Sequence, residues 1–192
     1  MTAPVQRMFI LPPVRDDFVF AVLRRNYDGL VNDTVEFALA NLHPIKPPPR
    51  IGPERVWQPT AAKHEVLLPS RIPELMSNPK LLCETFEVHA MPHQRYLAII
   101  LKLVLPTSAP LHEGWELARR FAKEIFVVEH ELPTILVMHT PALAGARNAN
   151  PPHIHIIALA RRWKNGFAEF ATIARDAAHE PLAQRWGAMR DD

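Results

Sequence analysis

Several residue types are scarce in this chain of 192 residues, and each scarcity excludes a class of protein. The single cysteine, Cys83, excludes an internal disulfide and fits the reducing cytoplasm, where we expect the protein to reside. Only six glycines occur, and none forms a glycine-rich phosphate loop. No apolar run approaches the roughly 18 residues of a membrane span, and no charged-then-apolar leader opens the chain. The formal net charge of +2 neither requires nor excludes nucleic acid as a partner.

Proline, by contrast, is abundant, with 20 residues against six glycines. Five of the prolines fall within residues 43–56, which we expect to form an extended excursion. The sequence contains no internal repeat and no change in composition that would mark a domain boundary. The sequence therefore predicts one domain over residues 1–192, with this proline-rich segment as its least regular part.

Short apolar runs bounded by turn residues alternate with segments of helical periodicity. This mixture predicts an α+β fold, in which a central antiparallel sheet of about five strands is flanked by helices packed on one side. The expected strands are 8–11, 65–68, 96–105, 135–138 and 154–159, and the expected helices are 18–25, 32–42, 79–88, 115–128 and a tail from Phe167 onward.

Histidines mark the ends of two neighbouring expected strands. His153 and His155 are two residues apart, so a strand places both on one face, and His139 closes the preceding strand. If the two strands pair in antiparallel fashion, three imidazoles converge, which suits a divalent metal with open coordination positions. A His-x-His pair is also often an ordinary surface pair. A histidine-triad nucleotide hydrolase would need a further histidine at position 157, which is Ile157.

Six segments between residues 57 and 167 carry a further pattern in their order and spacing. They are HEVLLP at 64–69, LCETFE at 82–87, LARRFA at 117–122, His139, NPPHIH at 150–155 followed by Arg161, and NGF at 165–167. Together they resemble the MobA/MobL family of plasmid mobilisation relaxases, which are HUH endonucleases. The chain departs from the family by an extra Pro152, by Leu159-Ala160 where the family has two threonines, and by the absence of its alanine-rich helix ending in tyrosine.

The resemblance implies an HUH-relaxase-like fold and a relaxase activity. Such an enzyme nicks and rejoins single-stranded or hairpin DNA at a transfer origin by tyrosine transesterification, alongside other mobilisation proteins. It implies that His139, His153 and His155 hold Mn²⁺ or Mg²⁺ against the scissile phosphate. Imidazole ligands favour Mn²⁺ or a heavier metal at equal availability.

The resemblance also assigns candidate roles outside the histidines. Tyr27 is the expected nucleophile, with Tyr96 as the fallback, and Glu87 is a candidate base or an orienting residue. Each has an ordinary alternative, since Tyr27 fits an aromatic residue at the end of a helix and Glu87 a solvated helix position. The residues expected to pair with DNA phosphates, or else to form a solvated basic end, are Arg161, Arg162 and Lys164.

Three functions therefore follow from the sequence. The first is the metal-dependent relaxase, and the second is a catalytically degenerate relaxase-like protein that binds DNA without the nucleophile. The third is a small metal-dependent phosphohydrolase. A Tyr27 side chain close to the metal would favour the first function, and a distant one would favour the second.

Overall fold

The structure is a computed structural model that describes residues 8–44, 50–51, 54–55, 57–91, 93–106, 108–143 and 150–191. Its centre is an antiparallel sheet of six strands in the order β1-β2-β8-β10-β9-β7. The expected α+β class is confirmed, and the sixth strand is a two-residue edge. The sheet strands are β1 (Phe9–Ile10), β2 (Phe18–Arg24), β7 (Lys63–Leu67), β8 (Tyr96–Val104), β9 (Thr134–His139) and β10 (His153–Leu159).

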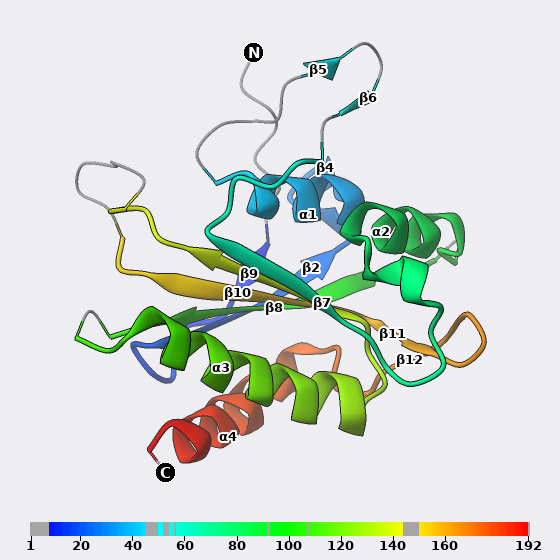
Figure 1. Cartoon of the computed structure of the whole chain (residues 1–192). Helices are drawn as coiled ribbons and strands as arrows, with labels where there is room; N and C mark the ends of the chain where they lie inside the picture. The colour runs from blue at the N-terminus through cyan, green and yellow to red at the C-terminus, as the bar shows by residue number, and fades with distance from the viewer. Residues whose placement is uncertain are drawn as a thin grey trace.

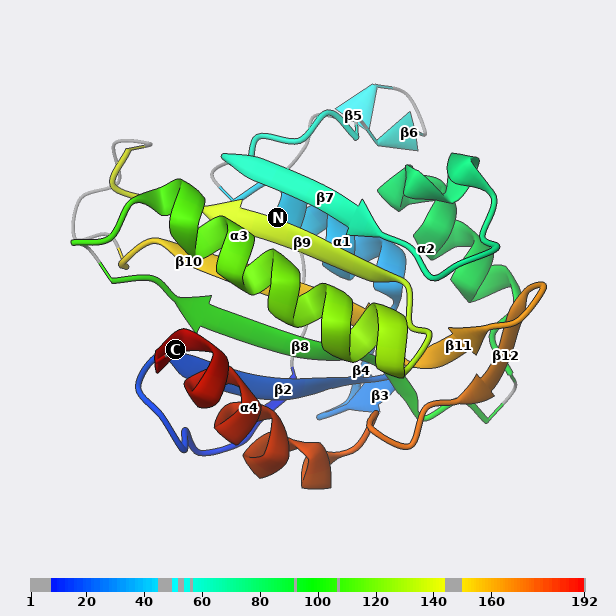
Figure 2. The same cartoon turned by 60° about the horizontal axis from the view of Figure 1, so that its bottom comes forward.

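Helices cover both faces of the sheet, so the expectation of helices on one side only was wrong. Helices α1 (Thr34–Leu42) and α2 (Pro79–Val88) lie on one face, and α3 (Leu111–Ala122) and α4 (His179–Asp191) lie on the other (Figures 1 and 2). Asp33 and Asn78 accept hydrogen bonds from the first turns of α1 and α2, which fixes where these two helices begin.

Strand β10 shows why both faces are covered. Ile154 and Ile156 belong to the core under α3 and α4, whereas Ile157 and Leu159 belong to the core under α1 and α2. All four are buried, with at most 1% of their surface exposed. A strand that is apolar on both faces needs a helical layer on each side, because either face would otherwise expose apolar surface to water.

Two expected helices were wrong for a related reason. The segment expected as helix 18–25 is β2, whose residues pair with β8 from Phe18 opposite Leu103 to Arg24 opposite Tyr96. A strand buried on both faces gives a continuous apolar run without alternation, which resembles a buried helix in sequence. The tail begins as the strand β12 (Phe167–Phe170), and its helix α4 starts only at His179.

Shorter elements connect these layers. They are β3 (Asn26–Tyr27), β4 (Leu30–Val31), β5 (Arg50–Ile51), β6 (Glu54–Arg55), β11 (Arg161–Trp163), two 3₁₀ turns (Glu74–Ser77 and Asp176–Ala178), and a π-helical continuation of α3 (Lys123–Glu129). Most of the proline-rich segment 43–56 lies outside the described residues. Within the described part of the chain, no helix is both long enough and apolar enough to cross a bilayer.

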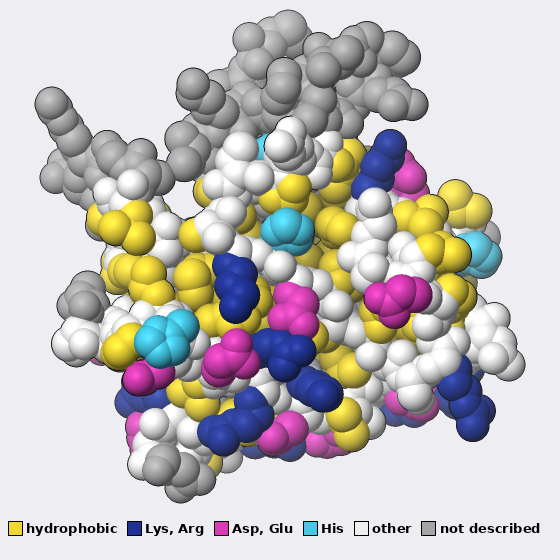
Figure 3. Space-filling model, in the orientation of Figure 1, with side chains coloured by type: hydrophobic (Ala, Val, Ile, Leu, Met, Phe, Trp, Pro, Cys, Tyr) yellow, Lys and Arg dark blue, Asp and Glu magenta, His cyan; other side chains and the backbone are white. Residues whose placement is uncertain are grey.

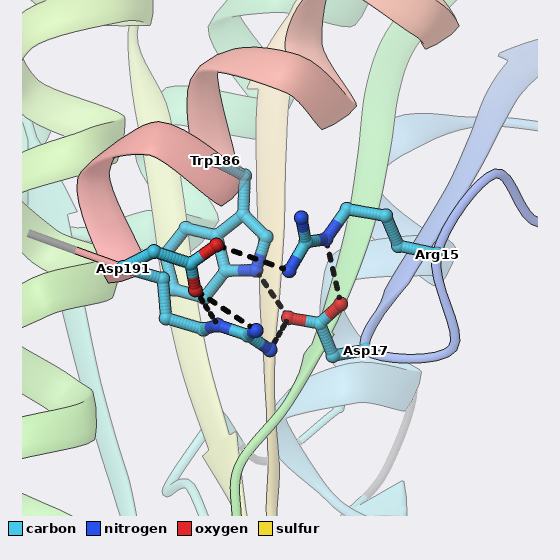
Figure 4. A network of polar contacts seen from close by, with 5 residues as sticks. Arg15, Asp17, Trp186 and Asp191 are labelled. Atoms are coloured by element: carbon cyan, nitrogen blue, oxygen red, sulfur yellow. Dashed lines mark hydrogen bonds and ion pairs between the residues drawn. The ribbon is translucent and has the colours of Figure 1, made fainter.

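A cluster of polar contacts anchors the C-terminal helix to the start of β2 (Figure 4). The Asp17 carboxylate accepts hydrogen bonds from Trp186 Nε1 at 2.9 Å, Arg190 Nη1 at 2.5 Å and Arg15 Nε at 3.1 Å. These contacts lower the pKa of Asp17, against the opposing effect of its burial. Because Trp186 is itself buried, this network fixes α4 over its face of the sheet.

The outer strand β7 is lined by ion pairs with α3. Arg119 binds the Glu65 carboxylate through Nε at 2.7 Å and Nη2 at 2.8 Å, and Lys63 lies 3.9 Å from Glu116. On the surface seen in Figure 3, basic and acidic side chains accordingly lie side by side over α3. This region is therefore not a basic band of the kind that tracks a nucleic-acid backbone.

Candidate metal centre

Three histidines meet at one end of the sheet, on the face that α1 and α2 cover. His139 ends β9 and stands directly opposite His153 on β10, and His155 follows on the same face. The ring centroids lie 5.1 Å apart for His139 and His153, 4.8 Å for His139 and His155, and 5.0 Å for His153 and His155. The convergence expected from the sequence is confirmed. It arises because the two strands pair in the register that puts positions 139 and 153 opposite each other.

Hydrogen bonds to backbone carbonyls orient two of the rings. His139 Nε2 lies 2.7 Å from the Asn41 carbonyl of α1, and His153 Nδ1 lies 2.8 Å from the Pro151 carbonyl. A carbonyl only accepts, so each of these nitrogens must carry the proton, which leaves a lone pair on His139 Nδ1 and on His153 Nε2. Carbonyl partners of this kind commonly fix the tautomer of metal-binding histidines.

The third ring, His155, contains an unpaired polar atom. Its Nδ1 is shielded from solvent and has no hydrogen-bond partner among the described residues. An unsatisfied buried nitrogen is unfavourable unless it finds a partner, and a metal ion is one such partner. One nitrogen from each of the three rings lies within 4.8 Å of the others, close enough for a single ion to bridge them after small ring movements.

The surroundings keep all three imidazoles neutral, as metal ligation requires. Burial is the main cause that lowers the pKa of His153 to about 4 and that of His155 well below its ordinary value. Burial likewise lowers the pKa of His139, while its bond to Asn41 opposes the shift. The donor set fits a divalent cation, and the absence of a carboxylate from the group favours Mn²⁺ or a heavier metal over Mg²⁺.

A lysine that the sequence analysis passed over also belongs to this centre. Lys102 lies directly opposite His155 on β8, and its charge contributes to the lowered pKa values of all three histidines. The sequence carried a signal for it, because Lys102 is the one charged residue in the apolar run 96–105. A half-buried lysine at this position would attract an anion such as phosphate.

Neither tyrosine of the chain lies near this centre. His153 pairs with Val104 at the end of β8, whereas Tyr96 is the first residue of the same strand. Tyr27 comes three residues after Arg24, which pairs with Tyr96, and lies in β3, outside the central sheet. Six to eight residue steps of β8 separate Tyr96 from the positions opposite His155 and His153, which is roughly 20–27 Å. The structure does not bring Tyr27 or Tyr96 to the histidines, although the chain has only these two tyrosines.

Glu87 has a structural role between two helices. Its carboxylate accepts hydrogen bonds from Thr34 N at 2.7 Å and Thr34 Oγ1 at 2.8 Å, and it pairs with Arg25 at 2.7 Å. Thr34 begins α1, whereas Asn41, which contacts His139, is near the end of that helix. Glu87 therefore joins α2 to the opposite end of α1 and is not placed as a base for the histidines.

The three basic residues expected to bind phosphate lie beyond the other end of β10. The Arg161 guanidinium donates to the carbonyls of His89, Phe167 and Ala168. The other two share one carboxylate, since Glu169 lies 2.7 Å from Lys164 and 4.0 Å from Arg162. These contacts within the protein give the three basic residues a structural role that needs no DNA. The structure does not group them with the histidines.

Comparison with solved structures gives a likeness of fold. No protein family and no curated protein matches the sequence. A solved structure described as "Molecular Basis of Vancomycin Resistance Transfer in Staphylococcus aureus" superposes with a TM-score of 0.57 over 69% of each chain, at 18% sequence identity. The likeness is one of architecture. It supports the expected arrangement of a central antiparallel sheet flanked by helices and does not extend to site residues.

Proposed function

We propose that this protein binds single-stranded DNA through a divalent metal held by His139, His153 and His155, without forming a tyrosyl–DNA link. DNA as the ligand is supported by the resemblance to MobA/MobL relaxases and by the shared fold with a protein of vancomycin resistance transfer. Of the three functions that the sequence left open, this proposal corresponds to the second, a relaxase-like protein that binds DNA without the nucleophile. The DNA that it would bind is single-stranded or hairpin DNA at a transfer origin.

Lone pairs on two oriented rings and an unpaired Nδ1 on the third support the metal site. A bound divalent cation supplies a positive charge that polarises a phosphate oxygen. The chain's own residues do the rest. Backbone carbonyls hold the rings in one tautomer, and Lys102 adds a second positive charge beside the phosphate.

The observation that carries the proposal is the distance between the tyrosines and the histidines. Transesterification requires the phenolic oxygen within hydrogen-bond reach of the reacting phosphate, about 3 Å, whereas roughly 20–27 Å of β8 separates Tyr96 from the positions opposite His155 and His153. Both tyrosines begin or follow rigid strands of that sheet, so local side-chain motion does not close this gap.

The test combines a binding assay with an adduct assay. Fluorescence anisotropy with a pool of labelled single-stranded oligonucleotides should show binding that depends on Mn²⁺ and is lost in EDTA. We expect His155→Gln to remove the metal dependence, whereas His112→Gln, an exposed histidine on α3, should leave it intact. Denaturing gels of the same mixtures should show no covalent protein–DNA adduct.

Three outcomes would contradict the proposal. A covalent adduct that disappears in Tyr27→Phe would show that the tyrosine reaches the phosphate, and the relaxase reaction would replace DNA binding as the function. Metal-dependent hydrolysis of bis(p-nitrophenyl) phosphate without DNA binding would identify the small phosphohydrolase instead. Binding that persists in EDTA and in His155→Gln would remove the histidine centre from DNA recognition.

A further inference from the structure

A hollow lies at the end of the sheet away from the histidines. Its volume is about 470 Å³, and its lining comes from the start of β8, the end of β12 and the segment that follows β12. Figure 2 shows β12 beyond the end at which β8 begins. Since Tyr96 lines this hollow and Val104 pairs with His153, the hollow and the metal centre are separated by the length of β8.

The charge of the hollow is positive and uncompensated. Arg95, Arg175 and His93 line it and are exposed, and none of its described lining residues is acidic. Within the described part of the chain, neither guanidinium has a carboxylate partner. Two arginines that line one hollow without a counter-ion attract a group with several anionic oxygens, such as a phosphate.

The nearest acidic residues in the sequence are already engaged elsewhere. Asp176, next to Arg175, pairs with Arg24 at 2.6 Å. Glu169, next to Phe170, pairs with Lys164 at 2.7 Å. Both neighbouring carboxylates are thus paired with cations other than Arg95 and Arg175, which leaves these two arginines available for an external anion.

Two aromatic rings complete the lining. Tyr96 and Phe170 are each half-buried, so part of each ring faces the hollow. The Arg95 guanidinium lies 5.3 Å from the centre of the Tyr96 ring. A cation held beside an aromatic surface is the combination that binds a planar ring and its phosphate together, because the ring stacks while the guanidinium pairs with the anion.

We propose that this hollow binds a nucleoside phosphate, with the phosphate on Arg95 and Arg175 and the base against Tyr96 or Phe170. Its volume falls within the range of about 300–1,000 Å³ that is typical of small-molecule sites. The ligand is either a free mononucleotide or one nucleotide of a single strand, since both present the same groups. The site does not depend on the metal centre, and it functions when the histidines are metal-free.

Isothermal titration calorimetry in EDTA tests the site on the full chain, with AMP, ribose 5-phosphate, inorganic phosphate and a short oligo(dT) as the four titrants. We expect AMP or oligo(dT) to bind, and ribose 5-phosphate and inorganic phosphate to bind at least about tenfold more weakly because they lack the base. Arg95→Gln/Arg175→Gln should weaken binding roughly 10- to 100-fold. Arg120→Gln/Lys123→Gln removes two exposed charges from the α3 segment and should leave binding unchanged.

The titrants also separate the two sources of the ligand. Binding of AMP indicates a free nucleotide, and binding of oligo(dT) alone, still lost in the Arg95/Arg175 variant, indicates a nucleotide within a strand. Equal affinity for AMP and inorganic phosphate would overturn the role of the rings. Absence of binding by all four titrants, or binding that the Arg95/Arg175 variant retains, would overturn the site. Because EDTA is present throughout, failure here is distinct from failure of the metal-dependent DNA binding.

Discussion

Acidification should destabilise the metal-free protein through the histidine centre before most carboxylates titrate. Burial lowers the pKa of His153 from 6.5 to about 4 in the folded chain. The unfolded chain therefore binds the proton more tightly, and stability is lost as the pH falls below 6.5. For His153 alone the loss is about 2 kcal/mol at pH 5 and about 3 kcal/mol at pH 4. His139 and His155, whose pKa values are also lowered, act in the same direction.

Urea denaturation in EDTA measures this effect. With an m-value of about 2–3 kcal/mol/M, a loss of about 2 kcal/mol lowers the urea midpoint by roughly 0.7–1 M between pH 7.5 and pH 5. Other groups also titrate in this range, so the diagnostic quantity is the difference between variants. His153→Gln should lose less stability than the wild type over this interval, and His112→Gln should follow the wild type.

Equal pH dependence in the wild type and in His153→Gln would refute the reasoning. It would mean that the imidazole is solvated in the folded chain, or that it gains a proton at no cost to folding.

Saturating Mn²⁺ at pH 7.5 should also raise the urea midpoint of the wild type, since a ligand that binds only the folded state stabilises it by mass action. The same addition should leave the midpoint of His155→Gln nearly unchanged.

Three further substitutions test the structural roles assigned above. Asp17→Ala should cost about 1–3 kcal/mol of unfolding free energy, because the hydrogen bonds from Trp186 and Arg190 lose their acceptor, and urea denaturation measures it. Glu87→Ala should destabilise by about 1–3 kcal/mol while leaving Mn²⁺ affinity in calorimetry unchanged; a large loss of that affinity would place Glu87 at the metal. Arg161→Gln should lower the melting temperature without weakening the binding of single-stranded DNA measured by anisotropy. Weaker binding at an unchanged melting temperature would instead make Arg161 a phosphate ligand.

The histidine cluster was accessible from the sequence because it depends on two local regularities. Alternation along a strand puts His153 and His155 on one face, and two apolar runs joined by a loop tend to pair as neighbours. The same pairing brings in His139 as the third member, because it closes the first of the two runs, and the resemblance to a known family added the expectation of a bound metal. Neither regularity predicts how deeply the rings are buried. The unpaired Nδ1 of His155 and the contact of His139 with the Asn41 carbonyl are therefore seen only in the structure.

The roles assigned to residues far from the histidines could not be judged from the sequence, because they depend on distances along the sheet. Tyr27 was assigned from the family resemblance, and its position relative to the histidines depends on the seven-residue strand β2, which the sequence predicted as a helix. Arg161 could not be distinguished from a phosphate ligand, since its carbonyl partners come from segments as far apart as His89 and Ala168. Such long-range pairings depend on the packing of whole elements, which periodicity does not encode.

The outer strand β7 has a consequence for how the protein behaves at high concentration. Its partner is β9 on one side only, so within the described residues its other edge presents backbone groups to solvent. Lys63 and Glu65 hold charge along that edge, and Arg119 fixes one of them in place. Charged side chains on an open edge disfavour strand-to-strand growth between copies. Replacing both residues with valine would keep the strand but would favour self-assembly into ordered aggregates.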